Sequence, residues 1–284
     1  MTFPKDGSSY IILSPIELSI RRKIKAVGKP LKEWDVQINY GIKTGCNEAF
    51  IITTEKRNEL LSQCQSEEER QRTAELIRPI LRGRDIKRYS YDWAGLWVIC
   101  ARLCEDIPTN YPTICHHLES FVGKGKLGDN STTKVFERPW WSWMQEPSYW
   151  KDFDRPILVW LELSDTPKFA LSNGLVPLNT VFFLSGESVD NLLALLNSKL
   201  VTWYFRECLG TSSGAGTNRW LKYTIENLPL VEDSSGALSS LVSQNGKMAR
   251  ISRVLDVQIE SVIASLYGLT PEEQAYIESY VTFK

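Results

Sequence analysis

The sequence predicts a mixed α/β (α+β) fold followed by C-terminal helices. A helical pattern covers residues 14–28, where Ser14 suits the N-cap, Pro15 the first helical position and Glu17 a capping box. Residues 36–40 alternate apolar and polar side chains, as a half-buried strand does. Three more helical patterns close the chain, at residues 238–248, 250–267 and 271–280. Helices at both ends with strands between them define the predicted class.

The middle of the chain supplies the remaining predicted elements. Apolar segments bounded by turn residues predict strands at 49–53, 96–101, 157–163, 168–171 and 180–184. Helical spacing predicts helices at 55–77, 111–121 and 188–197, the last renewed through Phe205. Small and polar residues predict loops at 106–110, 123–133, 210–217 and 233–236, and Asn173-Gly174 is a turn signal. We therefore divide the chain into an N-terminal helical connector (1–30), a central domain (31–232) and a C-terminal helical segment (233–284).

Composition describes an ordinary soluble globular protein of 284 residues, with 43% hydrophobic and 24% charged side chains. No apolar run approaches membrane-spanning length, and the N-terminus lacks a signal-peptide layout, so we expect no membrane partner and a cytoplasmic location. The cysteines form no CxxC pair, which favours reduced thiols over a disulfide framework or a metal site. They are Cys46, Cys64, Cys100, Cys104, Cys115 and Cys208.

Net charge is −1, which argues mildly against nucleic acid, but the charges are segregated along the chain. Residues 78–89 hold five basic side chains against one acid, Asp85. Residues 198–222 hold Lys199, Arg206, Arg219 and Lys222 against Glu207. Beyond Val231, acidic residues outnumber basic ones. Local basic stripes of this kind can bind phosphate although an acidic segment cancels the total.

No catalytic motif stands out. The lysine and threonine of residues 41–45 precede the second glycine, which is the wrong order for a P-loop. Residues 123–128 match G-x-G-x-x-G but follow a helix instead of a strand. His116 and His117 are adjacent on a predicted helix and so point apart, which argues against a two-histidine metal site. Residues 85–87 resemble part of a nuclease centre but lack a paired acid. The Asn-Pro-Pro-aromatic tetrad of methyltransferases does not occur. We expect no metal site and no catalysis by this chain alone.

Binding chemistry is stronger. The glycine turn (residues 41–47) combines two glycines with Lys43, Thr44 and Asn47 at a strand entrance. The arginine segment (residues 82–89) places cations around a glycine, where the backbone can approach a phosphate and arginine can fork onto guanine; a solvated turn is the alternative. The small-residue loop (residues 211–219) ends in arginine and is otherwise a flexible linker.

An aromatic cluster, Pro139-Trp140-Trp141-Ser142-Trp143, is followed by Tyr149-Trp150. Its rings could stack on bases, but aromatic residues at this density more often belong to a core.

These segments together resemble the target-recognition domain of Type IIG restriction–modification enzymes, the TaqI-like C-terminal specificity domain. The resemblance is carried by residues 41–52, 80–89, 196–199, 219–222 leading to Leu228-Pro229, and the ending 266–273. It covers most of the chain, and the order and spacing of the motifs make the set more specific than any one of them.

The resemblance implies that residues 31–232 are a DNA target-recognition domain, similar in fold to the recognition domains of Type I specificity subunits. It implies double-stranded DNA as partner, together with the methyltransferase and nuclease domains of a full-length enzyme, which this chain lacks. S-adenosylmethionine, the methyl donor, is then expected only in a separate methyltransferase domain, and no cofactor in this chain.

Residue chemistry and position in the motif loops nominate the contacts. Backbone contacts are expected from Lys43, Thr44, Arg84, Lys87 and Lys126. Base-edge or groove contacts are expected from Arg82, Arg88, Asn218 and Arg219. Two other classes stay open: a protein-interaction module using the C-terminal helices and the aromatic cluster, and an independent enzyme, for which no nucleophile–base pair was found.

Overall fold

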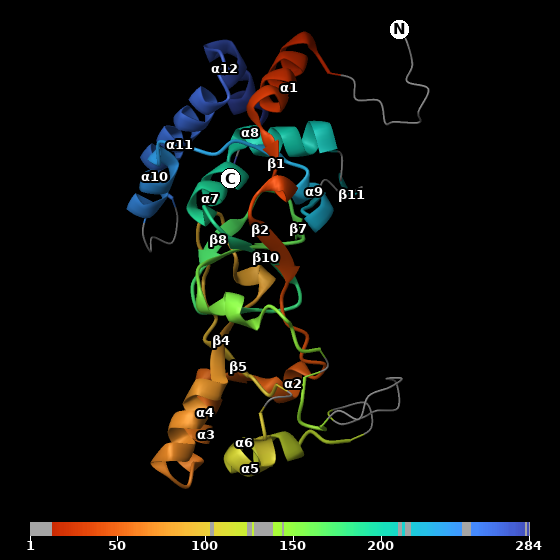
Figure 1. Cartoon of the computed structure of the whole chain (residues 1–284), viewed down its shortest axis with the longest axis vertical. Coiled ribbons are helices and arrows are strands. Elements are labelled where there is room, and N and C mark those ends of the chain that lie inside the picture. Colours follow the sequence, from red (N-terminus) through yellow and green to blue (C-terminus); the bar gives the residue numbers. More distant parts are fainter. Residues whose placement is uncertain are drawn as a thin grey trace.

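The computed structural model describes residues 13–102, 105–123, 127, 139–143, 145–209, 212–213, 217–245, 251–281 and 283. Figure 1 shows an elongated molecule with a sheet in the middle and helices at both ends. One end carries α1 (Pro15–Val27), α7 (Val189–Leu196), α8 (Lys199–Tyr204), α9 (Lys222–Glu226), α10 (Ala237–Asn245), α11 (Arg253–Leu266) and α12 (Pro271–Tyr280). The other carries α2 (Asn47–Phe50), α3 (Thr54–Gln63), α4 (Glu67–Leu76), α5 (Ile107–Asn110) and α6 (Pro112–Glu119).

The central sheet is antiparallel, in the order β2 (Val36–Tyr40), β10 (Val181–Gly186), β6 (Ile157–Leu161) and β8 (Phe169–Ser172). Its inner strands are buried on both faces, which is why β6 reads as an uninterrupted apolar run. Leu158 and Trp160 point into one core, and Ile157 and Val159 into a second core on the opposite face. A single sheet thus joins two cores.

The first core lies between the central sheet and a group of helices that includes the first helix, α1, and the last, α12. It contains Ile20 of α1, Trp203 of α8, Ile259 of α11 and Ile277 of α12. All three segments of the predicted domain division therefore contribute to one core.

The second core is built on a second sheet, in the order β3 (Ile51–Thr53), β5 (Leu96–Ile99), β4 (Ile77–Leu81) and β9 (Val176–Pro177). Strand β4 pairs antiparallel with β5 in its first half and parallel with β9 in its second. Trp143 is buried here and donates its Nε1 hydrogen to the Ile99 carbonyl at 3.0 Å. Trp140, Trp141 and Trp150 pack against the same core, so the core interpretation of the aromatic cluster is confirmed.

Short strands and turns complete the fold. Strand β1 (Lys29–Pro30) pairs with β13 (Pro229–Leu230), and β11 (Ser212–Ser213), β12 (Thr217–Arg219) and β7 (Leu163–Ser164) form a three-stranded sheet. Short 3-10 helices cover Leu31–Glu33, Gly83–Asp85 and Trp150–Asp154, and a π-helix follows α8 at Phe205–Leu209. Among the described residues, no helix has the length and hydropathy needed to cross a bilayer.

Several sequence predictions need correction, among them the loop expected at 210–217, which contains β11. The helix expected at 55–77 is two helices, because Ser66 accepts the backbone N–H of Glu69 and caps a new helix, α4. The strand expected at 49–53 begins at Ile51, since residues 47–50 form one helical turn. The loop expected at 106–110 contains α5, whose first turn is capped by Asp106.

The glycine turn braces the start of β10. The Gly41 N–H donates to the Val181 carbonyl at 2.8 Å, and the Ile42 N–H donates to the Pro177 carbonyl at 2.9 Å. A Cβ at Gly41 would lie 2.3 Å from the carbonyl oxygens of Pro177 and Leu178. Two backbones therefore meet at a separation that admits only glycine.

Arg88 ties the arginine segment to the C-terminal helices. Its guanidinium donates to the Asn197 carbonyl through Nε (3.1 Å) and Nη2 (2.9 Å), and Nη2 also pairs with Asp256 at 2.7 Å. Glu260 lies 3.8 Å from the same nitrogen. The predicted base-edge residue is thus turned inward, onto α11.

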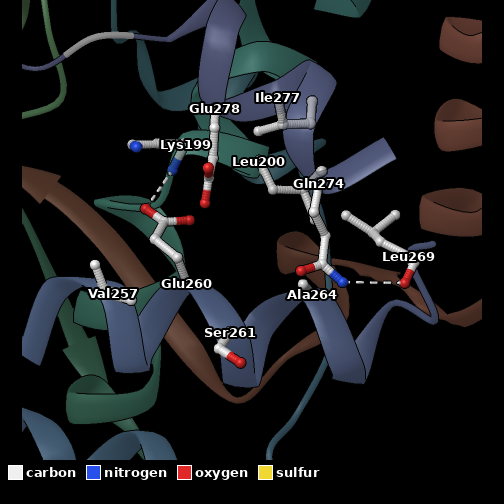
Figure 2. A pocket seen from close by; sticks show the side chains of 10 residues that line it. All are labelled: Lys199, Leu200, Val257, Glu260, Ser261, Ala264, Leu269, Gln274, Ile277 and Glu278. Carbon is white, nitrogen blue, oxygen red and sulfur yellow. Dashed lines mark hydrogen bonds between the residues drawn. The ribbon is translucent and has the colours of Figure 1, made fainter. Parts of the chain in front are cut away.

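Glu260 lies at the edge of a cavity of about 220 Å³ between α8, α11 and α12, shown in Figure 2. Its carboxylate accepts the Lys199 N–H at 2.9 Å, at the first turn of α8. Burial raises the pKa of Glu260 from its usual 4.5 to about 7, against the lowering effect of the Lys199 bond and of Arg88. The negative charge of nearby Asp256 raises the pKa of Glu260 further.

Replacing Gly41 by alanine tests the close approach. Because the added methyl meets main-chain carbonyls, Gly41→Ala should lower the free energy of unfolding by about 3 kcal/mol or more, measured by urea denaturation. Gly174→Ala is the matched control: Gly174 has φ of +80° and no atom within 4 Å of an added Cβ, so only conformational strain of about 1 kcal/mol is expected. Equal losses in the two variants would contradict the steric argument.

Glu260 should make stability depend on pH. A carboxyl whose pKa is raised on folding binds more protons in the folded state, so its contribution to stability falls as pH rises from about 4.5 to about 7. Glu260→Gln removes this titration while keeping an acceptor for Lys199. Relative to the variant, the wild type should lose up to about 3 kcal/mol of unfolding free energy between pH 4.5 and 7.5.

The measurement is urea unfolding across that pH range. Glu278→Gln, an exposed carboxylate on the same cavity wall, controls for the loss of one acidic group. Parallel pH profiles for the wild type and Glu260→Gln would refute the assignment.

Candidate nucleic-acid interface

A groove of about 570 Å³ opens where β6 ends and β10 begins, beside the 3-10 helix Gly83–Asp85. The arginine segment forms one wall. The end of β6 with Glu162 and Leu163, and the turn before β10, form the others. The lining residues are Arg82, Gly83, Arg84, Leu161, Glu162, Leu163, Leu178, Asn179 and Thr180.

Arg82 is held in a fixed orientation within this groove. Its Nε and Nη2 donate to the two carboxylate oxygens of Asp85 at 2.8 and 2.7 Å, and Asp85 is itself buried. These hydrogen bonds raise the pKa of Arg82, because they favour its charged form. Within the described part of the chain these are the guanidinium's only hydrogen bonds, so the edge carrying Nη1 can still donate to a ligand.

Arg84 and Lys87 point to solvent from the same segment. Arg84 is exposed and makes no ion pair with any residue that the structure describes. Lys87 is exposed and pairs with Asp92. Both cations suit contact with a phosphate backbone, and Arg84 does so from the groove wall.

Arg219 reaches the groove from another sheet. It lies on β12, opposite Leu163 of β7, and its Nη2 is 3.3 Å from the Glu162 carboxylate on the groove wall. Its neighbour Asn218 is buried and donates Nδ2 to the Asp165 carbonyl at 3.1 Å. Asn218 therefore shapes the turn after β7, while Arg219 lies at the rim.

The glycine turn contributes a flanking cation. Lys43 is exposed, with its ammonium 5.0 Å from the centre of the Tyr40 ring. The preceding residue, Ile42, forms a bridge with Leu178 of the groove. Thr44 is 2% exposed, and its hydroxyl donates to Asn47 Oδ1 at 2.7 Å, so it holds the turn together.

The structure thus brings Arg82, Arg84 and Arg219 together at one groove, with Lys43 beside it. Arg88, like Thr44 and Asn218, is directed inward, and Lys126 lies outside the described residues. Sequence reasoning missed three groove residues. Asn179 and Thr180 are a polar pair directly before the buried strand β10, and Glu162 is an acid directly after the buried strand β6; these positions were their only sequence signal.

Among the described residues, no three His, Cys, Asp or Glu side chains are placed to hold a metal ion. His116 faces solvent, whereas His117 contacts the Ala49 carbonyl at 3.0 Å, so the two rings do point apart. Burial lowers the pKa of His117.

Solved structures share this architecture. The Type IIL restriction–modification enzyme MmeI, whose structure was determined in complex with DNA, matches with a TM-score of 0.59 and 11% identity, over 89% of this chain and 35% of that enzyme. The Type IIG restriction endonuclease BpuSI matches with a TM-score of 0.57 and 13% identity, over 94% of this chain and 33% of that enzyme. At such identities the likeness shows the fold alone. The chain spans about a third of the length of either enzyme.

A search of the curated proteins finds no match. The family comparison is positive: residues 78–230, more than half of the chain, match the TaqI-like C-terminal specificity domain. The matched range begins in β4, includes the arginine segment and the groove, and ends with β13. The resemblance inferred from the motifs is confirmed, and the chain belongs to the family of TaqI-like C-terminal specificity domains.

Proposed function

We propose that this chain recognises a specific sequence in double-stranded DNA, as the specificity region of a Type IIG restriction–modification enzyme with adenine methyltransferase activity. The observation that carries the proposal is the arginine-lined groove. Arg82 is fixed by Asp85 with one donor edge available, and Arg84 extends from the next turn of chain. Guanidinium groups of this kind bind guanine O6 and N7 in a major groove.

Orientation of Arg82 before binding favours specificity. A free arginine loses side-chain entropy when it is ordered on DNA, whereas Arg82 is already ordered by its two bonds to Asp85. Arg219 pairs with Glu162 more loosely, at 3.3 Å, and both side chains are partly exposed. The paired acids also limit the net positive charge of the groove, which reduces sequence-independent attraction and leaves a larger share of affinity to base contacts.

Phosphate contacts then belong to the surrounding cations. Lys43 lies on one side of the groove through the Ile42–Leu178 bridge, and Arg84 and Lys87 lie along the arginine segment. Such contacts set the register of a duplex without reading it.

The chemistry of the enzyme is assigned to other domains. We propose that the chain alone is not catalytic, that methyltransferase and nuclease domains are its partners, and that S-adenosylmethionine binds in the former. The short span relative to MmeI and BpuSI supports this division.

The C-terminal helices favour a second role, contact with those domains. Val254 and Val257 lie one turn apart on α11 with exposures of 69% and 60%. Two exposed valines one turn apart, on a helix whose opposite face is buried at Ile259 and Ile263, suit a protein interface.

Arg84 should contribute to affinity for all duplexes. Arg84→Gln removes a positive charge from the groove wall, so binding to a random-sequence duplex should weaken about 3- to 10-fold, and the slope of log K against log salt should decrease by about 1. Fluorescence anisotropy between 50 and 200 mM salt measures both. Arg70→Gln, on α4 and paired with Glu67, is the control and should change neither. Absence of binding to any duplex at low salt would overturn the proposal.

The isolated chain should not transfer methyl groups. Incubated with tritiated S-adenosylmethionine and duplex DNA, it should leave label incorporation at background, while an active adenine methyltransferase provides the positive control. Robust turnover by the chain alone would reassign it as an enzyme.

A further inference from the structure

The turn between β9 and β10 places two polar side chains, Asn179 and Thr180, on the groove wall. Both are exposed. The turn is closed by a hydrogen bond from the Val181 N–H to the Leu178 carbonyl at 2.8 Å. It packs directly against the arginine segment, since Thr180 Oγ1 would be only 3.3 Å from a Cβ at Gly83.

Main-chain bonds fix this turn from several directions. The Leu178 N–H donates to the Leu81 carbonyl at 2.9 Å, which ties the turn to β4. Gly41 and Ile42 donate to the carbonyls of Val181 and Pro177, which ties it to the glycine turn. The backbone at Asn179 is therefore set by its neighbours and does not depend on its side chain.

The side chain of Asn179 has no structural role that explains it. Asparagine is often selected in turns because it tolerates positive φ, but the non-glycine residues with positive φ in the described chain are Tyr89 and Ser188. Nor does the Asn179 carboxamide hydrogen-bond to any residue that the structure describes. Its donor and its acceptor are both available in the groove.

We propose that Asn179 reads an adenine in the target sequence. A carboxamide can accept from adenine N6 and donate to N7 at once, a pairing that no other base offers in the major groove. A rigid backbone positions the amide, while Arg82 of the adjoining arginine segment contacts a neighbouring base. This assignment rests on the proposed DNA-recognition function and adds a residue that determines specificity.

The test is selection of bound duplexes from a randomised library by the 284-residue chain, followed by sequencing. The wild type should enrich a motif that contains adenine at one position read by Asn179. In Asn179→Ala, adenine preference at that position alone should fall about 5- to 100-fold, with the other positions retained. The thermal unfolding midpoint should be unchanged, because the lost side chain makes no internal bond.

Two further variants sharpen the result. Asn179→Asp keeps the size of the side chain but loses its donor, so the preferred base at that position should shift from adenine toward cytosine, whose N4 donates. Asn173→Ala removes an exposed asparagine from the turn before β9, outside the groove, and should leave the enriched motif unchanged.

The outcomes separate two kinds of failure. If the wild type enriches a motif and Asn179→Ala enriches the same one, the inference about Asn179 is wrong while the proposed function stands. A uniform loss of affinity for all sequences in Asn179→Ala would also overturn it, since that is the behaviour of a phosphate contact. No enrichment by the wild type would overturn the proposed function, and this inference with it.

Discussion

Burial of the central sheet on both faces is the constraint from which the rest of the structure follows. Strands β6 and β10 contribute alternate side chains to two cores, so both cores depend on the same two strands. Leu158 and Val159, adjacent in sequence, serve opposite cores. The groove lies where β6 ends and β10 begins, so its walls adjoin strands that are buried on both faces.

The arginine segment is fixed by the same arrangement. Ile86 is buried in the second core and Tyr89 in the first, so the segment crosses from one to the other. Tyr89 adopts φ of 67° and donates its N–H to the Phe169 carbonyl of β8 at 2.8 Å. The strain of a left-handed tyrosine is offset by this anchorage. Between the two buried side chains the chain has little freedom, and Arg84 just before them is presented from a defined backbone.

Local signals were sufficient for part of this picture. The capping boxes at Ser14 and Thr270 are both present, and the fold class and family inferred from the motifs are confirmed. The inward orientation of Arg88 was not predictable, because its partner Asp256 is distant in sequence. Residue type and position in a motif loop do not distinguish a buried polar residue from a surface contact, which is why Thr44 is a predicted contact although it is 2% exposed.

The bracing of the turn before β10 by main-chain bonds has a consequence for substitution. Side chains that make no internal bond on a fixed backbone can be exchanged at little cost in stability, since substitutions of this type usually change it by less than about 0.5 kcal/mol. The glycine at position 41 has no such freedom, because backbone carbonyls surround it. Residues 179–180 therefore tolerate substitution as far as folding is concerned, whereas position 41 is restricted to glycine.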